Sequence, residues 1–303
     1  MQLFDVDNVA LCAIVTACLQ FAFFVVVCKI HIQKVVDIAG GITFCAVALV
    51  SLCIGQTFLV RQLLLTTLVC LWAVRLATYL LYRSIRAGGD DRFIGKKENC
   101  CRLLNFWTFQ AIWVFVVSLP VIFVNAPTTP DKPYSEEFTV LDVVGTVTFI
   151  VGFVLEVIAD VQRFLFRDNP SNDNKWCMSG LWKWSRHPNY FGEMLVWWGA
   201  FLLSITTLQG IQWLAVFSPL FTMAILLFLS GIPVLEKKAD EIYGSNEDYR
   251  NYKNGTSPLI PLPPTLYQRL PTTFKRFLFC DLSCYHFADP EDGSSKAFIP
   301  TPV

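Results

Sequence analysis

The chain has 303 residues, of which 54% are hydrophobic and only 16% are charged, and its mean hydropathy is +0.49. A chain of this length with so few charged side chains is too apolar for a water-soluble fold, so the composition predicts a multi-span membrane protein. The 24 basic residues balance the 24 acidic ones, which speaks against a nucleic-acid partner.

Seven apolar runs are each long enough to cross a bilayer as a helix, which takes about 20 residues. They are residues 9–30, 36–54, 60–82, 106–124, 139–162, 190–208 and 211–235. The sequence therefore predicts an all-α, polytopic helical bundle with about seven transmembrane helices. Six spans remain the alternative, because Gly40 and Gly41 lie inside the second run.

The basic residues collect on one side of a seven-span protein. All of them fall there except Arg61 and Lys132, which fall on the other side, and Arg75, which lies within the third run. By the positive-inside rule, this asymmetry predicts a cytosolic C-terminus and two cytosolic basic loops.

The eleven cysteines do not indicate a disulfide framework. Six of them lie inside apolar runs, where a free thiol behaves as a small hydrophobic side chain. The others show no paired CxxC spacing, and the three histidines lie far apart in the sequence. We therefore expect neither disulfides nor a metal site.

Ionisable residues of the fifth run share one helix face. They are Glu156, Asp160, Arg163 and Arg167. Their spacing of four, three and four residues fits 3.6 residues per turn. Pairing of a carboxylate with Arg75 and ordinary interfacial anchoring would explain single residues, but neither requires cations to continue the acidic stripe. The joint pattern favours a polar cavity open to the cytosol.

The segment before the sixth run combines cations, aromatic residues and a predicted helix start. Pro188 is suited to the first position of that helix, so the helix N-terminus should point into the basic loop. Free backbone N–H groups there, together with Arg186 and His187, would bind a phosphate. Further cations of the same loop are Arg163, Arg167, Lys175 and Lys183.

Four tryptophans accompany this segment. We interpret Trp182 as part of a cofactor site because of its neighbours, and Trp197 and Trp198 as an interfacial aromatic belt. Trp184 fits either interpretation. The chain has no GxGxxG and no GxxxxGK[ST] motif after a strand, so a dinucleotide would have to be held by helices.

The run Trp184 to Glu193, with the sequence WSRHPNYFGE, resembles the signature of the steroid 5-alpha-reductase C-terminal superfamily, and most closely its uncharacterised bacterial, plant and protist branch. An earlier pattern is similar to that branch and consists of Trp72, Arg75, Leu76, Tyr79, Arg83, Asp90 and Arg92. A second resembles a run of the sterol C14 and C7 reductases and consists of Asp160, Gln162, Arg163, Phe166 and Arg167. A third resembles the closing motif of the superfamily and consists of Ser230 to Pro233, Glu236, Asp240, Tyr243, Gly244, Tyr249 and Tyr252.

This resemblance implies NADPH-dependent reduction of a carbon–carbon double bond in a steroid, sterol or related lipid at the endoplasmic reticulum. It places the following residues in the cofactor pocket: Arg163, Arg167, Trp182, Arg186, His187, Asn189, Tyr190, Glu236, Asp240, Tyr249 and Tyr252. The nicotinamide would supply a hydride, and a positioned acid would supply a proton or polarise an enone oxygen. The candidates for that acid are Tyr79, Glu156 and Tyr190.

The expected domain organisation follows from the extent of the resemblance. Residues 1–60 would form N-terminal transmembrane helices, residues 61–264 the reductase-like catalytic domain, and residues 265–303 a cytosolic tail that becomes mobile. The partners are then the bilayer and a lipid substrate, without metal or nucleic acid.

Two other functions remain open. An RHPxYxG core followed by a glutamate and a tyrosine-rich segment also occurs in isoprenylcysteine and phospholipid methyltransferases, which use S-adenosylmethionine. That cofactor has no phosphate, so it gives no reason for the aligned Arg163 and Arg167. The third possibility is a non-catalytic lipid-binding protein with a degenerate pocket.

Overall fold

The structure is a computed structural model that describes residues 7–30, 35–86, 100–127, 137–282 and 285. These residues form helices and connecting segments, with one isolated β-bridge between Ser185 and Ser257 and no strand among them. The prediction of an all-α fold is confirmed. Asp90 and Arg92 of the pattern noted above lie outside the described residues.

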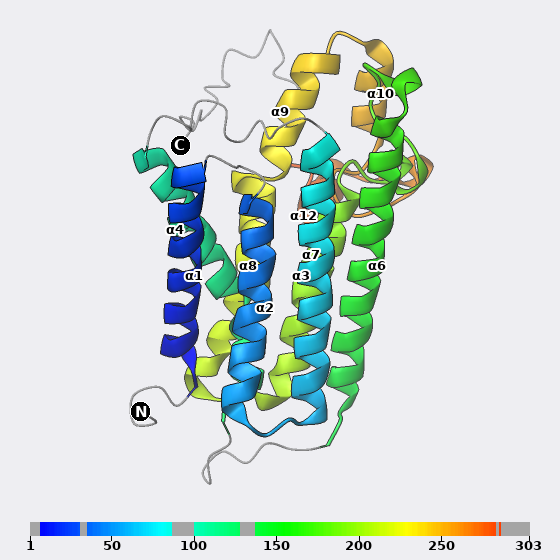
Figure 1. The fold of residues 1–303 in the computed structure, drawn as a ribbon. Coiled ribbons are helices and arrows are strands. Elements are labelled where there is room, and N and C mark those ends of the chain that lie inside the picture. Colours follow the sequence, from blue (N-terminus) through cyan, green and yellow to red (C-terminus); the bar gives the residue numbers. More distant parts are fainter. Residues whose placement is uncertain (1–6, 31–34, 87–99, 128–136, 283–284, 286–303) are drawn as a thin grey trace. The chain divides into compact units, whose positions relative to one another are not determined.

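Helices occupy all seven apolar runs (Figure 1). The first five runs contain α1 (Val9–Ile30), α2 (Val35–Gly55), α3 (Val60–Arg86), the pair α4 (Cys100–Val117) and α5 (Leu119–Val124), and α6 (Val140–Asp168). The sixth contains α7 (Pro188–Ser204) and the 3-10 turn η4 (Ile205–Thr207). The seventh contains η5 (Gly210–Val216), α8 (Phe217–Ala224) and the π-helical η6 (Ile225–Leu229) and leads into α9 (Ile232–Tyr243).

The remaining elements are short. They are the 3-10 turns η2 (Pro170–Asn172) and η3 (Gly180–Lys183) and the helices α10 (Glu247–Gly255), α11 (Pro264–Tyr267) and α12 (Thr272–Leu278).

Five helical segments of the described chain are long and apolar enough to cross a membrane. They are Val9–Lys29, Ile38–Gly55, Val60–Arg86, Val140–Asp168 and Gly210–Tyr243. This is the architecture of a polytopic membrane protein with the bilayer as its partner. The count of seven stays a prediction, because the helices of the fourth and sixth runs are shorter than the other five.

The chain divides into two compact units, of which the first contains Met1–Phe149 and Trp197–Phe221. In this unit α2 packs against both α1 and α3 (Figure 1). Asn125, directly after α5, lies with its Nδ2 atom 3.0 Å from Ser51 Oγ on α2 and 2.9 Å from Thr66 Oγ1 on α3. Because these polar groups are buried, their contacts fix α5 against α2 and α3.

A buried ion pair joins the N-terminal ends of α3 and α6 in the same unit. Arg61 Nε lies 2.6 Å from Asp142 Oδ1, and Arg61 Nη2 lies 2.8 Å from Asp142 Oδ2. The parallel contacts form the two-pronged geometry that arginine makes with a carboxylate.

The interpretation of Trp197 as part of an interfacial belt is wrong. Its side chain is 1% exposed, and its ring centroid lies 4.8 Å from that of Trp72 and 5.6 Å from that of Phe44. The three rings form an aromatic core in the first unit, which contributes both buried area and edge-to-face contacts.

Glycines let α6 and α7 approach within backbone contact. A Cβ atom on Gly192 of α7 would lie 2.7 Å from the carbonyl oxygen of Gly152 and 2.7 Å from the backbone nitrogen of Glu156, both on α6. A Cβ atom on Gly199 would lie 2.5 Å from the nitrogen of Phe149. Since real side chains do not approach backbone atoms so closely, this seam requires glycine at both positions.

The second unit contains Ile150–Val196 and Thr222–Val303. Its last apolar helix ends in the π-helical turn η6, and Gly231 then redirects the chain into α9. A Cβ atom at Gly231 would lie 2.3 Å from the carbonyl oxygen of Leu226, so the redirection requires glycine. Asn246 caps α10 by accepting hydrogen bonds from the backbone N–H groups of Asp248 and Tyr249.

The C-terminal segment folds back onto this unit. Tyr285 is buried and donates its hydroxyl hydrogen bond to the carbonyl oxygen of Leu227, and Tyr267 donates one to Asp281 Oδ2 over 2.6 Å. The second unit thus includes α11, α12 and the segment up to residue 282, and the boundary of a cytosolic tail at residue 265 stays a prediction.

Candidate functional site

The loop between α6 and α7 is shaped by one glutamine and one glycine. Gln162 Oε1 accepts a hydrogen bond of 2.9 Å from the backbone N–H of Leu181. Gly180 has a φ of +55°, and a Cβ atom there would collide with the Gln162 side chain. Only glycine fits this left-handed, crowded position. The turn directs Trp182 toward α6, where its Nε1 donates to the carbonyl oxygen of Ala159 over 2.9 Å.

Ser185 and Arg186 are attached to the chain segment that follows α10. The backbone N–H of Arg186 donates to the carbonyl oxygen of Ser257 over 2.9 Å, and Ser185 Oγ donates to that of Leu259 over 2.6 Å. Ser185 Oγ also accepts from the backbone N–H of His187 over 3.1 Å. α7 then begins at Pro188, as predicted.

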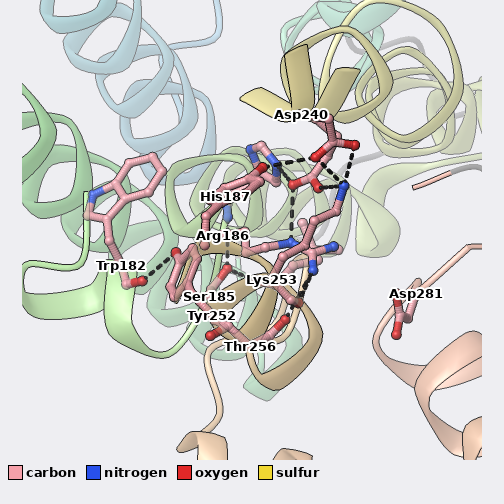
Figure 2. A network of polar contacts seen from close by, with 12 residues as sticks. Trp182, Ser185, Arg186, His187, Asp240, Tyr252, Lys253, Thr256 and Asp281 are labelled. Atoms are coloured by element: carbon pink, nitrogen blue, oxygen red, sulfur yellow. Dashed lines mark hydrogen bonds and ion pairs between the residues drawn. The ribbon is translucent and has the colours of Figure 1, made fainter. Parts of the chain in front are cut away.

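Arg186 and His187 meet carboxylate and ammonium groups of α9 and α10 in a buried network (Figure 2). Arg186 Nε lies 3.1 Å and His187 Nε2 lies 2.8 Å from the same oxygen, Glu236 Oε1. Lys253 Nζ lies 3.1 Å from Glu236 Oε2 and 2.6 Å from Asp240 Oδ2. The network thus brings together two carboxylates, two basic side chains and one imidazole.

The guanidinium of Arg186 makes its contacts with groups of the protein itself. Besides Glu236, its Nη1 donates to the carbonyl oxygens of Lys253 and, over 3.4 Å, of Thr256. Burial opposes the charged form, but the carboxylates of Glu236 and Asp281 outweigh it and hold the pKa of Arg186 above its ordinary value. Arg186 therefore fastens α10 and α9 to the start of α7 and stays charged.

His187 is 5% exposed, and burial lowers its pKa against the opposing hydrogen bond to Glu236. The neutral imidazole then donates from Nε2 to the glutamate carboxylate, which leaves Nδ1 as an acceptor. Nδ1 has no hydrogen-bond partner among the described residues. An acceptor this deeply buried fits a hydrogen-bond donor on a ligand.

Aromatic residues pack beside the network. The ring centroid of Trp176 lies 5.9 Å from that of Tyr243, 5.4 Å from that of Tyr249 and 6.4 Å from that of Tyr252. Tyr252 donates its hydroxyl hydrogen bond to the carbonyl oxygen of Trp182 over 2.8 Å. Tyr249 donates to Asp240 Oδ1 over 3.0 Å, and burial followed by the charge of Glu236 raises its pKa, so it stays protonated.

The cations on the last turns of α6 are more accessible than Arg186. The guanidinium of Arg163 is half-buried and lies 4.8 Å from the Trp182 ring centroid. Arg167 is exposed and donates from Nη1 to the Tyr243 hydroxyl over 3.2 Å. Lys175 and Lys183 of the loop are exposed as well. These four residues present the positive charge that a phosphate group requires.

The acidic end of the α6 stripe is buried. Glu156 and Asp160 are both enclosed, and Asp160 Oδ1 accepts a hydrogen bond of 3.2 Å from Asn189 Nδ2. Tyr190 is half-buried, and its ring stacks on that of His187 at a centroid distance of 5.6 Å and an angle of 9°. Burial along the stripe decreases from the two carboxylates through Arg163 to Arg167, as expected for one face that leads toward water.

The eleven predicted cofactor residues all belong to the second unit. Tyr79 belongs to the first unit, where its ring centroid lies 5.7 Å from the Arg83 guanidinium. Our sequence interpretation missed Lys253 and Ser185. Lys253 could have been found, because Tyr249, Tyr252 and Lys253 have the spacing of one helix face.

The described residues contain no group of three or more His, Cys, Asp or Glu side chains that could hold a metal ion.

The family model described as "Protein of unknown function (DUF1295)" matches residues 23–256. The chain belongs to this family. DUF1295 is related to steroid 5-alpha-reductase-like membrane proteins, which confirms the resemblance at this level. The match ends at Thr256, so the segment that holds Ser185 and Arg186 from the other side lies just beyond it.

Two further proteins are similar to parts of this chain. An uncharacterized protein of Schizosaccharomyces pombe is 24% identical over 228 residues, which cover 66% of this chain and 63% of the relative. A probable O-methyltransferase of Ustilaginoidea virens, ustE, is 41% identical over 46 residues, which cover 15% of this chain and 16% of the relative. The chain thus aligns with less than two thirds of the length of either relative. No solved structure matches the chain.

Proposed function

We propose that this protein is a membrane-embedded, NADPH-dependent enzyme that reduces a carbon–carbon double bond in a steroid, sterol or related lipid. The observation that carries the proposal is the accessible positive charge of Arg163, Arg167 and Lys175 beside a buried network that begins α7. A cofactor with phosphate groups fits such a cluster, whereas S-adenosylmethionine carries a positively charged sulfonium and no phosphate, so it does not require these cations.

The residues present fit the cofactor in two respects. The three cations would hold its phosphates. His187 Nδ1 and Asn189 Oδ1, which have no hydrogen-bond partner within the described part of the chain, would accept hydrogen bonds from its donor groups. When bound, NADPH supplies a hydride. Glu236, Lys253 and Asp240 act through Arg186 and His187 by holding their positions.

Tyr190 is the best placed of the three candidate acids. Its ring stacks on His187 and remains half-exposed, whereas Glu156 is buried. A tyrosine hydroxyl would deliver a proton to the substrate carbon or polarise a substrate oxygen. We also propose that the protein lies in the endoplasmic reticulum membrane with this site on the cytosolic side. The basic loops support this orientation by the positive-inside rule.

The second candidate is an S-adenosylmethionine-dependent methyltransferase. The observation in its favour is the 46-residue match to a probable O-methyltransferase. A non-catalytic lipid-binding protein is the third.

A ligand titration separates these functions. The thermal stability of the detergent-purified protein would be measured against NADPH, NADH and S-adenosylmethionine, since a ligand that binds only the folded state raises the apparent stability. Selective stabilisation by NADPH supports the reductase. Stabilisation by S-adenosylmethionine alone supports the methyltransferase, and no stabilisation by any of them supports the lipid-binding protein.

A variant tests the phosphate contact. Arg167→Ala should weaken NADPH binding by about tenfold or more and NADH binding less, because a hydrogen bond to a charged group contributes about 1.5–3 kcal/mol. Tyr243→Phe is the matched control, since it removes the hydrogen bond of Arg167 and keeps the cation. Equal losses for both nucleotides would refute the role of Arg167.

A further inference from the structure

α12 carries an exposed apolar face. Phe274, Phe277 and Leu278 are 57%, 86% and 57% exposed, and their spacing of three and one residues puts them on one side of the helix. Leu266 of the neighbouring α11 is exposed as well. Large aromatic side chains with this much exposed surface are unusual on a part of a protein that faces only water.

The same stretch is uniformly basic. Residues 257–280 contain Arg269, Lys275 and Arg276 but no aspartate or glutamate. Arg269 and Arg276 are exposed, and Lys275 Nζ lies 4.7 Å from the Tyr267 ring centroid. We call Leu266, Phe274, Phe277 and Leu278, together with these three cations, the C-terminal patch.

The patch is tied to a segment that is apolar enough to cross the membrane. Phe279, directly after α12, is buried, and Tyr285 packs against Leu226 and Leu227. Leu226 and Leu227 belong to the candidate span Gly210–Tyr243. Tyr285 follows Leu278 by only seven positions, which limits their distance to about 25 Å. The patch therefore stays close to the bilayer.

We propose that the C-terminal patch docks onto the anionic headgroup surface of the bilayer in which the protein is embedded. Helices with Phe and Leu on one face and Lys or Arg beside it lie at the membrane interface, with the apolar side chains in the headgroup region. The cations bind lipid phosphate and carboxylate groups, and the absence of acidic residues from 257–280 removes repulsion by the anionic surface. Charge and position thus favour lipid over a protein partner or a second copy.

Hydrogen exchange of the full-length protein in lipid nanodiscs tests this docking. Discs of phosphatidylcholine alone would be compared with discs that also contain phosphatidylserine. We expect slower amide exchange of residues 272–279 in the anionic discs. Arg276→Glu should reduce this protection at least about fivefold, since each cation near an anionic surface contributes about this factor. Phe277→Ser should reduce the protection in both kinds of disc.

A matched control is available on α10. Arg250 is an exposed cation of the same unit outside the patch, so Arg250→Glu should leave the exchange of residues 272–279 unchanged. Unchanged exchange of α10 in each patch variant shows that the unit is folded. Equal exchange in both kinds of disc would overturn the proposal. Protection that appears only in discs with two copies of the protein would overturn it in favour of self-association.

Discussion

Lys253 Nζ and Glu236 Oε2 lie 3.1 Å apart, and their side chains are 2% and 6% exposed. The same ammonium group contacts both oxygens of Asp240, at 2.7 and 2.6 Å. One lysine of α10 therefore compensates the charge of two carboxylates of α9, one of which also binds Arg186 and His187. The electrostatic balance of the candidate site therefore depends on one lysine of α10.

Removal of this lysine should destabilise the protein strongly. Lys253→Met leaves Glu236 and Asp240 without their common cation, and breaking a buried ion pair in this way costs about 3–5 kcal/mol. We expect a lower midpoint of thermal unfolding in detergent. Lys237→Met is the control, because Lys237 is an exposed cation on α9. Similar midpoints for the two variants would contradict the bridging role.

The stability of the protein should fall in mildly acidic solution because of His187. Burial lowers the pKa of this histidine below its ordinary value of about 6.5. Between the two pKa values the unfolded chain binds a proton that the folded chain does not. The stability of the folded state that depends on a neutral His187 is therefore fully present above about pH 6.5. It is lost as the pH falls from about 6.5 toward the lower pKa of the folded state.

Thermal unfolding at about pH 7.5 and about pH 5.5 measures this effect. The wild-type midpoint should fall between the two, and His187→Gln should show a smaller fall, because glutamine does not titrate. A fall of the same size in both proteins would assign the pH dependence to other groups. The comparison is specific, since His31 and His286 remain in both proteins.

The close contact between α6 and α7 at Gly192 should not accommodate an added methyl group. Gly192→Ala would place a Cβ atom 2.7 Å from two backbone atoms of α6, and such overpacking costs about 1–3 kcal/mol or more. Gly40→Ala in α2 is the matched control, since the nearest atom would be 3.4 Å away and alanine favours a helix by about 1 kcal/mol. Purified yield and unfolding midpoint should fall for Gly192→Ala only. A stable Gly192→Ala protein would mean that α6 and α7 are not in backbone contact.

The ion pair of the first unit should show the difference between removing one charge and removing two. Arg61→Met leaves the buried Asp142 carboxylate uncompensated, so we expect a large loss of stability. The double variant Arg61→Met/Asp142→Asn should recover most of it, because no buried charge remains. Chemical unfolding of the wild type, Arg61→Met, Asp142→Asn and the double variant measures the coupling, and additive losses would contradict a direct pair.

Much of the architecture follows from the sequence because its signals are local. Apolar runs of about 20 residues located the helices, and α1 coincides with the predicted run. Pro188 predicted the start of α7 because its ring suits the first helical position. The breaks within the fourth and seventh runs were missed, because an uninterrupted run of apolar residues does not show where a helix stops or changes its hydrogen-bond pattern.

The contents of the site were predictable in part. The motif around Arg186 and the closing motif with Glu236 identified segments that the structure brings together in one network. Their pairing was not predictable, because the sequence pattern suggested that Arg186 faces a ligand, whereas its guanidinium binds Glu236 and backbone carbonyls. A basic residue in a motif reveals its charge, but only the fold reveals which carboxylate it meets.

The pairing of Ser185 and Arg186 with the segment after α10 determines when the site can form during biosynthesis. These contacts join residues about 70 positions apart, and the intervening chain contains α7, the last apolar run and α9. A ribosome-bound chain that ends before residue 257 lacks the carbonyl groups that hold Ser185 Oγ and the Arg186 N–H. The network at the candidate site therefore forms only after the last apolar helix has been synthesised, so its assembly is a late step in the folding of this chain.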